Sequence, residues 1–286
     1  MSEGCLPICV ERILVPLDKS THSFAALKAA IELARHYDAE LTGVFIEDIT
    51  ILNLAQMPFH QEVGEYTAII REISSDGLSR GLHVQSRWVI QSFRKLINET
   101  DIIADFAVLR GDVNEMIDKE AQKCDLIIIG KSGTNILGRS RLGSTAKMMI
   151  QEHKVPLLLV EENNQLGYPM ILLYENSPEG KISLETARDL LDPDENLVIL
   201  LNKDNPLLFS ETTTQLKKWA SIHQINISIQ GFKTRSLRRH IHMIDKLKTG
   251  LFILPHNADP INHSIAQVCL EMISLPVMLI RVKDLQ

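Results

Sequence analysis

The sequence predicts an α/β protein made of two tandem, doubly wound, mostly parallel sheets of five strands each. Short apolar runs that end near Gly, Pro or Asp alternate with longer segments in which apolar residues recur at helical spacing. The same order of segments begins again after a polar, glycine-ended stretch at 161–167. At 286 residues the chain is long enough for two domains, which we expect at 1–162 and 168–286.

The elements of the first half follow in order. We expect strands at 12–18, 40–46, 104–109, 125–130 and 155–160, and helices at 24–37, 78–100, 112–123 and 146–153. Ser20 or Thr21 is expected to cap the first helix. Residues 47–77 contain Pro58 and Gly64 and show no sustained period. They are expected to form an irregular insertion with short helical pieces, which could cover the ligand-binding edge of the sheet or make a partner surface.

The composition narrows the classes of protein. Apolar residues make up 45% of the chain and charged residues 23%, as in an ordinary globular protein. The formal net charge of −6 argues against a general nucleic-acid binder. There is no apolar run long enough to span a membrane, and residues 1–10 lack the basic start and apolar centre of a signal peptide. We therefore expect a cytoplasmic protein with no membrane or nucleic-acid partner.

A glycine-rich loop follows the strand at 125–130. Gly130, Gly133, Gly138 and Gly143 precede Ser144, Thr145 and a segment that can form a helix. Glycines let backbone N–H groups approach an anion closely, and a helix N-terminus adds unpaired donors and a positive dipole end. The spacing matches neither the Walker loop nor G-x-G-x-x-G. The pattern predicts a nucleotide site of another kind.

The loop has the spacing G-x2-G-x9-G-S, at Gly130, Gly133, Gly143 and Ser144. With the apolar strands on both sides, it closely resembles the ATP-binding signature of the universal stress protein family. The first strand, which ends at Asp18, also resembles that family, although the family commonly has Asp-Gly-Ser where this chain has Asp-Lys-Ser. The resemblance implies the strand order 3-2-1-4-5 in each half.

The resemblance also implies the ligand and its contacts. ATP, with Mg²⁺, is the expected cofactor. Asp18 and the backbone at Pro16 and Leu17 would hold the adenosine, and Val44 and Ile129 would line the pocket for the base and ribose. The phosphates would be held by Gly130, Gly133, Gly143, Ser144 and Thr145. Arg139 and Arg141 lie in the loop and could add positive charge, which is our inference from their position.

The second half repeats this order but departs from it at the loop. Residues 170–177 align with 13–20, which places Glu175 opposite Asp18, and 251–255 align with 126–130. Pro255 replaces Gly130, His263 replaces Gly143, and the loop is shorter. Proline has no N–H to offer a phosphate. We therefore expect a degenerate domain of the same family that lacks the ATP site.

Assembly follows from the same resemblance. Single-domain family members commonly pair through their fifth strands, so a tandem chain can make this pairing internally, with 155–160 beside 277–281. The two halves would then form an internal pseudo-dimer, which covers two apolar edges. A homodimer of the whole chain is left open.

Other chemistry finds less support in the sequence. The segment 235–242, with His256 and His263, lacks the carboxylate or cysteine that would complete a zinc site, and its basic residues are typical of a solvated helix face. The four cysteines include no C-x-x-C pair and are expected to be free thiols without a metal. No G-x-S-x-G elbow is present, and we assign no catalytic residue.

The sequence thus predicts an ATP-binding regulatory protein of the stress response with an unidentified protein partner. A slow ATPase or nucleotide-transferring enzyme is one alternative. A non-catalytic scaffold whose second half binds another ligand is the other.

Overall fold

The computed structural model describes residues 6–50, 61–63, 70–72, 75–131, 142–152, 155–256 and 260–281. The elements of the first half are β1 (Arg12–Pro16), α1 (Thr21–Tyr37), β2 (Glu40–Asp48), β3 (Gln61–Val63), β4 (Ile70–Glu72), α3 (Ser75–Ile97), β5 (Ala104–Gly111), α4 (Val113–Ala121), β6 (Leu126–Gly130), α5 (Ser144–Glu152) and β7 (Leu157–Val160). Those of the second half are β8 (Gln165–Tyr174), α6 (Pro178–Leu190), β9 (Asn196–Asn202), α7 (Pro206–His223), β10 (Asn226–Phe232), η1 (Thr234–Ser236), α8 (Leu237–Ile244), β11 (Thr249–Pro255), α9 (Pro260–Met272) and β12 (Val277–Ile280).

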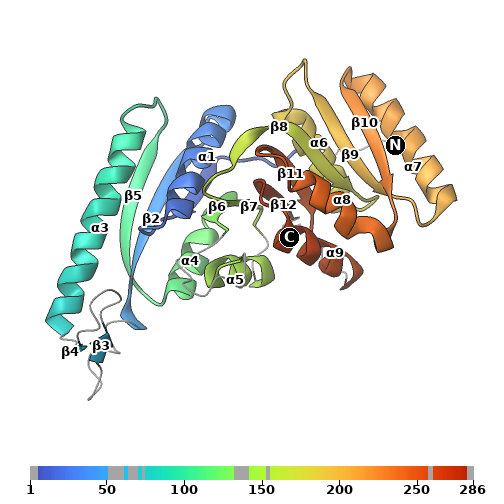
Figure 1. The fold of residues 1–286 in the computed structure, drawn as a ribbon. Coiled ribbons are helices and arrows are strands. Elements are labelled where there is room, and N and C mark those ends of the chain that lie inside the picture. The colour runs from blue at the N-terminus through green and yellow to red at the C-terminus, as the bar shows by residue number, and fades with distance from the viewer. Residues whose placement is uncertain are drawn as a thin grey trace.

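One ten-stranded sheet runs through the described residues of both halves, in the order β10-β9-β8-β11-β12-β7-β6-β1-β2-β5. Figure 1 shows this sheet crossing the molecule with helices on both faces. Within each half the strands follow the order third, second, first, fourth, fifth, and they pair in parallel. The predicted α/β class with doubly wound, mostly parallel sheets is confirmed.

The two halves join through their fifth strands. β7 and β12 are antiparallel neighbours, with Val277 opposite Leu159 and Leu279 opposite Leu157. This is the pairing that the sequence analysis expects between 155–160 and 277–281. All four residues are buried, so the junction continues the core. The segment before β1 also crosses to the second half, where the Ile8 N–H donates to Thr186 Oγ1 of α6 at 3.2 Å.

Each face of the sheet carries one apolar cluster that spans the junction. On one face Leu158 and Met278 belong to the cluster beneath α1 and α6. On the other, Leu157 and Val277 belong to the cluster beneath α5 and α9. The strands at the centre, such as β6 and β7, are buried on both faces, as their continuous apolar runs predict.

Two boundaries differ from the sequence-based expectation. β8 begins at Gln165 and includes Gly167, which we expected in the linker, because Gln165 pairs with Thr249 of β11. β2 continues to Asp48, because its last residues pair with Arg110 and Gly111 of β5.

The insertion expected at 47–77 is also more regular than predicted where it is described. β3 and β4 form a small antiparallel hairpin, in which Gln61 lies opposite Glu72, and α3 begins at Ser75. Residues 51–60, 64–69 and 73–74 lie outside the described residues.

Candidate nucleotide-binding site

A cavity of about 370 Å³ lies where β1, β2 and β6 end and α5 begins. Every expected site residue that the structure describes lines it. These residues are Pro16, Leu17, Asp18, Val44, Ile129, Gly130, Gly143, Ser144 and Thr145. The other two, Gly133 and Arg139, lie outside the described residues, as does Arg141.

The sheet topology places this cavity. β1 pairs with β2 on one side and with β6 on the other. The connection after β1 leads to β2 on one side, whereas the connection after β6 leads away from β1 to β7 on the other side. In open α/β sheets such a switch point leaves a crevice outside the carboxyl ends of the strands, where ligands bind. The first-half cavity lies at that point.

A turn at the end of β1 holds Asp18 at the cavity. The Ser20 N–H and the Ser20 hydroxyl both donate to Asp18 Oδ1, the N–H at 2.8 Å. Ser20 Oγ in turn accepts from the Ser23 N–H at 3.1 Å, which caps α1. Asp18 itself is exposed. These bonds fix the carboxylate at the mouth of the cavity.

Gly130 allows α1 to approach the end of β6. A Cβ at this position would lie 2.9 Å from both the carbonyl carbon and the Cβ of His22. These distances are shorter than ordinary van der Waals contact, and one of the two atoms is in the backbone. The glycine is therefore required by packing as well as by its place at the cavity.

The other end of the cavity is formed by the start of α5. The Gly143 N–H donates to the Lys131 carbonyl at 2.9 Å, which joins the two ends of the glycine-rich loop. Ser144, Thr145 and Ala146 of the first turn of α5 line the cavity. The first N–H groups of a helix have no partner within it, and this end of the helix carries positive potential. This end of the cavity suits an anion.

The opposite side of the cavity is apolar. Val44 and Ile129 from the sheet meet Val113 and Ile117 from α4 there. Three of these side chains are buried, and Val113 is half-buried. An apolar wall beside a helix end with positive potential suits a ligand that has a flat base and a phosphate group.

Sequence reasoning missed several lining residues. They are Ser23, Phe45, Ile46, Asp48, Val113, Ile117 and Ala146, with Ser20 foreseen only as a cap. Ile46 and Asp48 lie two and four residues beyond Val44, so the alternation of side chains along a strand could have found them. Val113 and Ile117 lie one helical turn apart, but the sequence does not indicate which helix covers the cavity.

The cavity is lined by carboxylates, which are possible ligands of a metal ion. In the part of the chain that the structure describes, the acidic side chains that line the cavity are Asp18 and Asp48. Among the described residues, no group of three or more His, Cys, Asp or Glu side chains could hold a metal ion. Mg²⁺ is commonly bound by one or two carboxylates together with the phosphates of a nucleotide. The residues present therefore fit Mg²⁺ as a companion of a bound nucleotide.

The corresponding edge of the second half has a similar turn and a smaller cavity. The Ser177 hydroxyl donates to Glu175 Oε1 at 2.9 Å and accepts from the Gly180 N–H at 3.0 Å. Pro255 lies opposite Ile280, as Gly130 lies opposite Val160. The cavity beside Glu175 and Pro255 measures about 150 Å³. The turn resembles that of Asp18 and Ser20, but less space is left at the strand ends.

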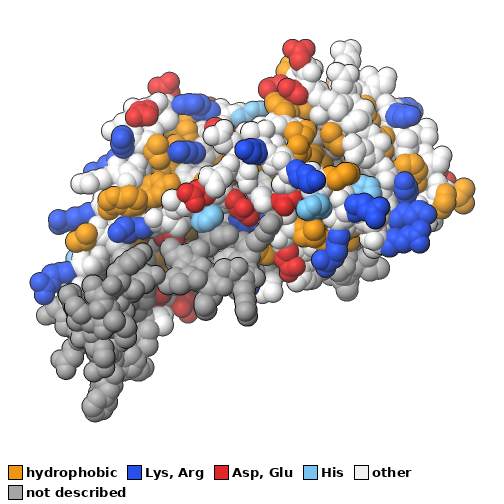
Figure 2. Space-filling model, viewed as in Figure 1, with side chains coloured by type: hydrophobic (Ala, Val, Ile, Leu, Met, Phe, Trp, Pro, Cys, Tyr) orange, Lys and Arg blue, Asp and Glu red, His pale blue; other side chains and the backbone are white. Residues whose placement is uncertain are grey.

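The basic segment at 235–242 forms η1 and much of α8. Leu237 and Ile241 face the core, whereas Arg235, Arg238 and Arg239 are exposed. Figure 2 shows lysine and arginine side chains gathered at this end of the second half. The segment has the burial pattern of the solvated helix face that the sequence predicts.

Three cysteines are described and are free thiols, Cys9 exposed and Cys124 and Cys269 buried. No helix in the described part of the chain is long and apolar enough to cross a membrane.

Comparisons with known proteins agree with this fold. The profile of the Universal stress protein family matches residues 10–161. A universal stress protein of Methanocaldococcus jannaschii is 28% identical over 154 residues, which cover 53% of this chain and 82% of that protein. A stress response protein of Bacillus subtilis is 26% identical over 162 residues, which cover 53% of this chain and 98% of that protein.

Among solved structures, a universal stress protein from Archaeoglobus fulgidus matches with a TM-score of 0.73 at 14% identity. The match covers 97% of this chain and 98% of that one, so the likeness extends over both halves of the fold. The family profile spans the whole first half, including every strand and helix that forms the cavity. The chain belongs to the universal stress protein family.

Proposed function

We propose that the chain binds one ATP in the cavity of its first half, and that the bound nucleotide regulates contact with a protein partner in a cytoplasmic stress response. The observation that carries this proposal is the meeting of two distant segments at one cavity. The turn at Asp18 and the helix start at Ser144 lie far apart in the sequence but line the same space. The volume of about 370 Å³ lies within the usual range for ligand pockets.

Each side of the cavity has a role in this proposal. Val44 and Ile129 would contact the adenine base and ribose, beside the turn that fixes Asp18. The N–H groups at Ser144 and Thr145 would hold the phosphates at the N-terminus of α5, and Gly143, whose own N–H is bonded to Lys131, would let the phosphates approach closely. Mg²⁺ bound with the nucleotide would neutralise phosphate charge.

We propose a single site because the two halves differ at the strand ends. Pro255 provides no N–H where Gly130 does, and the second-half cavity is smaller. The similar turns at Ser20 and Ser177, together with the shared strand order, support a tandem repeat whose second domain is degenerate.

Binding is favoured over rapid turnover. Backbone N–H groups and hydroxyls stabilise a bound phosphate in its ground state, and uniform binding of this kind does not lower a chemical barrier. Asp18 accepts two hydrogen bonds from Ser20 and would lie at the adenosine end. A slow ATPase remains the alternative, and steady-state assays should give rates well below about 1 per second.

Isothermal titration and native mass spectrometry test the proposal. The wild-type chain should bind one ATP, and Gly143→Val should abolish binding, because the added side chain blocks approach to the backbone. Gly81→Val is the matched control, since Gly81 is exposed on α3 and a Cβ there meets nothing within 4 Å. Two equivalent sites, or unchanged affinity in the Gly143→Val variant, would refute the assignment.

A further inference from the structure

The helix that begins at the first-half cavity is held at its other end by the second half. Arg281, which follows β12, is 6% exposed. Its Nη1 donates to the Met149 carbonyl at 3.0 Å, and its Nη2 donates to the Ile150 carbonyl. Both carbonyls lie near the C-terminal end of α5, and Ser144 at the N-terminus lines the cavity. One helix thus connects the cavity to the second half.

The charge of Arg281 suits this position. Burial lowers the pKa of its guanidinium to about 10, so the side chain stays protonated at neutral pH. The last carbonyls of a helix have no partner within it, and a cation near them interacts favourably with the helix dipole. Arg281 therefore satisfies the C-terminal end of α5 from a different half of the fold.

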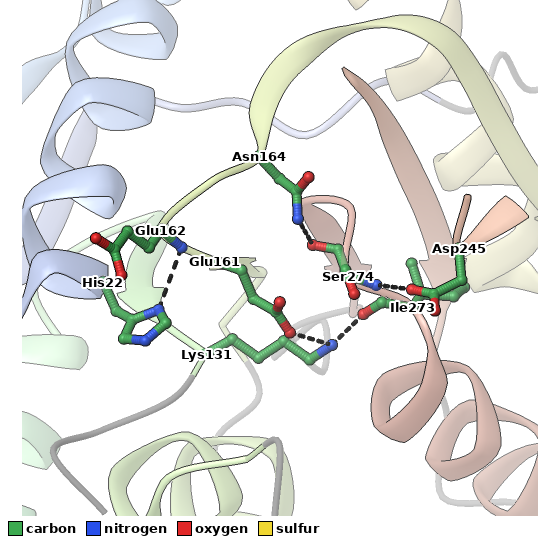
Figure 3. Close-up of polar contacts among 8 residues, drawn as sticks. All are labelled: His22, Lys131, Glu161, Glu162, Asn164, Asp245, Ile273 and Ser274. Atoms are coloured by element: carbon green, nitrogen blue, oxygen red, sulfur yellow. Dashed lines mark hydrogen bonds and ion pairs between the residues drawn. The ribbon is translucent and has the colours of Figure 1, made fainter. Parts of the chain in front are cut away.

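Lys131 makes a second connection, in the opposite direction. It follows Gly130 at the start of the glycine-rich loop and is 0% exposed. Its Nζ lies 3.3 Å from Glu161 Oε1 and donates to the carbonyl of Ile273, just beyond α9. Figure 3 shows this side chain extending from the first half to the segment at Ile273.

The main chain of Lys131 holds the loop at the same time. Its carbonyl accepts the Gly143 N–H at 2.9 Å, and its own N–H donates to the Val160 carbonyl at 2.8 Å. A hydrogen bond at Lys131 therefore joins the two ends of the glycine-rich loop, and the side chain of the same residue is held by the second half.

The segment that receives Lys131 is held by the linker and by the second half. The amide of Asn164 donates to the Ser274 carbonyl at 2.7 Å, and the Ser274 N–H donates to Asp245 Oδ1 at 2.9 Å (Figure 3). Asp245 directly follows α8, so the acceptor for Lys131 belongs to a fixed part of the second half.

We propose that Lys131 and Arg281 are positioning residues for the nucleotide cavity, through which the second half holds the loop ends and α5 in the geometry that binds phosphate. This inference rests on the proposed function and deepens it. The second half would support the first-half site without contacting the nucleotide. Affinity for the nucleotide would then depend on the β7–β12 junction.

Hydrogen exchange without nucleotide is the first test. In Arg281→Met, amides of α5 and of Gly143 should exchange faster than in the wild type. Lys131→Met with Glu161→Gln, which removes both charges of this ion pair together, should show the same effect at Gly143. Asn205→Ala is the control, because Asn205 caps α7 at the far end of the second half and its loss lowers stability away from the junction (Figure 1). Exchange at α5 in this control should stay as in the wild type.

Titration with ATP is the second test. Arg281→Met should weaken binding at least about 5-fold, the lower end of typical coupling between sites. Arg281→Lys, which keeps the charge, should recover part of the loss, and Asn205→Ala should bind normally. If the wild type bound no ATP, the proposed function would fail, and the exchange data would still decide the positioning role. The inference would be overturned if the amides of α5 and Gly143 exchanged at the wild-type rate both in Arg281→Met and in Lys131→Met with Glu161→Gln.

Discussion

Gly130→Ala tests whether close packing of α1 on β6 shapes the first-half cavity. The added Cβ would lie 2.9 Å from the backbone carbonyl carbon and from the Cβ of His22, and 3.1 Å from the Ser23 nitrogen. None of these atoms is the flexible end of a side chain, so α1 must shift to relieve the contact. Overpacking of this kind typically costs about 1–3 kcal/mol.

We expect a loss of about 2 kcal/mol in the free energy of unfolding for Gly130→Ala, because the contacts involve backbone. For a chain of 286 residues that unfolds as one unit, this corresponds to a fall in Tm of roughly 3 °C. Urea denaturation should show a lower midpoint with an unchanged slope. ATP affinity should fall as well, because the shift would displace the turn that fixes Asp18.

Gly81→Ala is the matched control for this substitution. Gly81 lies exposed within α3, and a Cβ there meets no atom within 4 Å. Replacing a helical glycine by alanine at such a site should stabilise the chain by about 0.5–1 kcal/mol. The reasoning fails if Gly130→Ala unfolds at the wild-type urea concentration, or if both substitutions shift the midpoint in the same direction.

Three further predictions concern stability. Asp112→Ala removes the acceptor for the Asn114 and Glu115 N–H groups at the start of α4 and should cost about 0.5–2 kcal/mol in urea denaturation, with Asp112→Asn close to wild type. Leu158→Ala, at a fully buried junction position opposite Met278, should cost about 2–5 kcal/mol and move a single calorimetric transition, so two separate transitions would contradict a shared core. Burial raises the pKa of the Cys269 thiol from 9.0 to about 12. The folded state therefore keeps the proton longer than the unfolded state, and this contribution to the free energy of unfolding is complete below pH 9. It is lost between about pH 9 and 12, at up to about 1.4 kcal/mol per pH unit. Cys269→Ala should therefore flatten the alkaline fall in stability, and an unchanged slope would count against this assignment.

The features that could be predicted from sequence are those specified by short local patterns. Four consecutive apolar residues predict a strand buried on both faces, and Leu126 to Ile129 of β6 are all buried. The spacing of the glycines predicts a site at the end of that strand, and Gly130 and Gly143 line the same cavity. The sequence predicts Ser20 or Thr21 as the cap of the first helix, and Ser20 is the N-cap of α1.

The features that could not be predicted depend on partners far away in the chain. The polar residue Gln165 begins β8 because Thr249 lies beside it, and no local pattern indicates that pairing. Lys131 and Arg281 are charged, and charged side chains are rarely buried unless paired. Their burial becomes favourable through carbonyl groups of the opposite half, which only the assembled sheet brings near.

The junction also determines which strands form the edges of the sheet. β7 and β12 are buried at every residue, so either one left as an edge would expose an apolar row of unpaired backbone groups. Pairing them leaves β5 and β10 at the ends of the ten-stranded sheet, and both carry exposed residues, such as Asp105 and Gln230. The two apolar strands, β7 and β12, thus pair with each other within the chain, and the more polar strands β5 and β10 form the edges of the sheet. This arrangement also brings the C-terminal end of α5 within reach of Arg281, so the pairing that covers the edges supports the proposed nucleotide site.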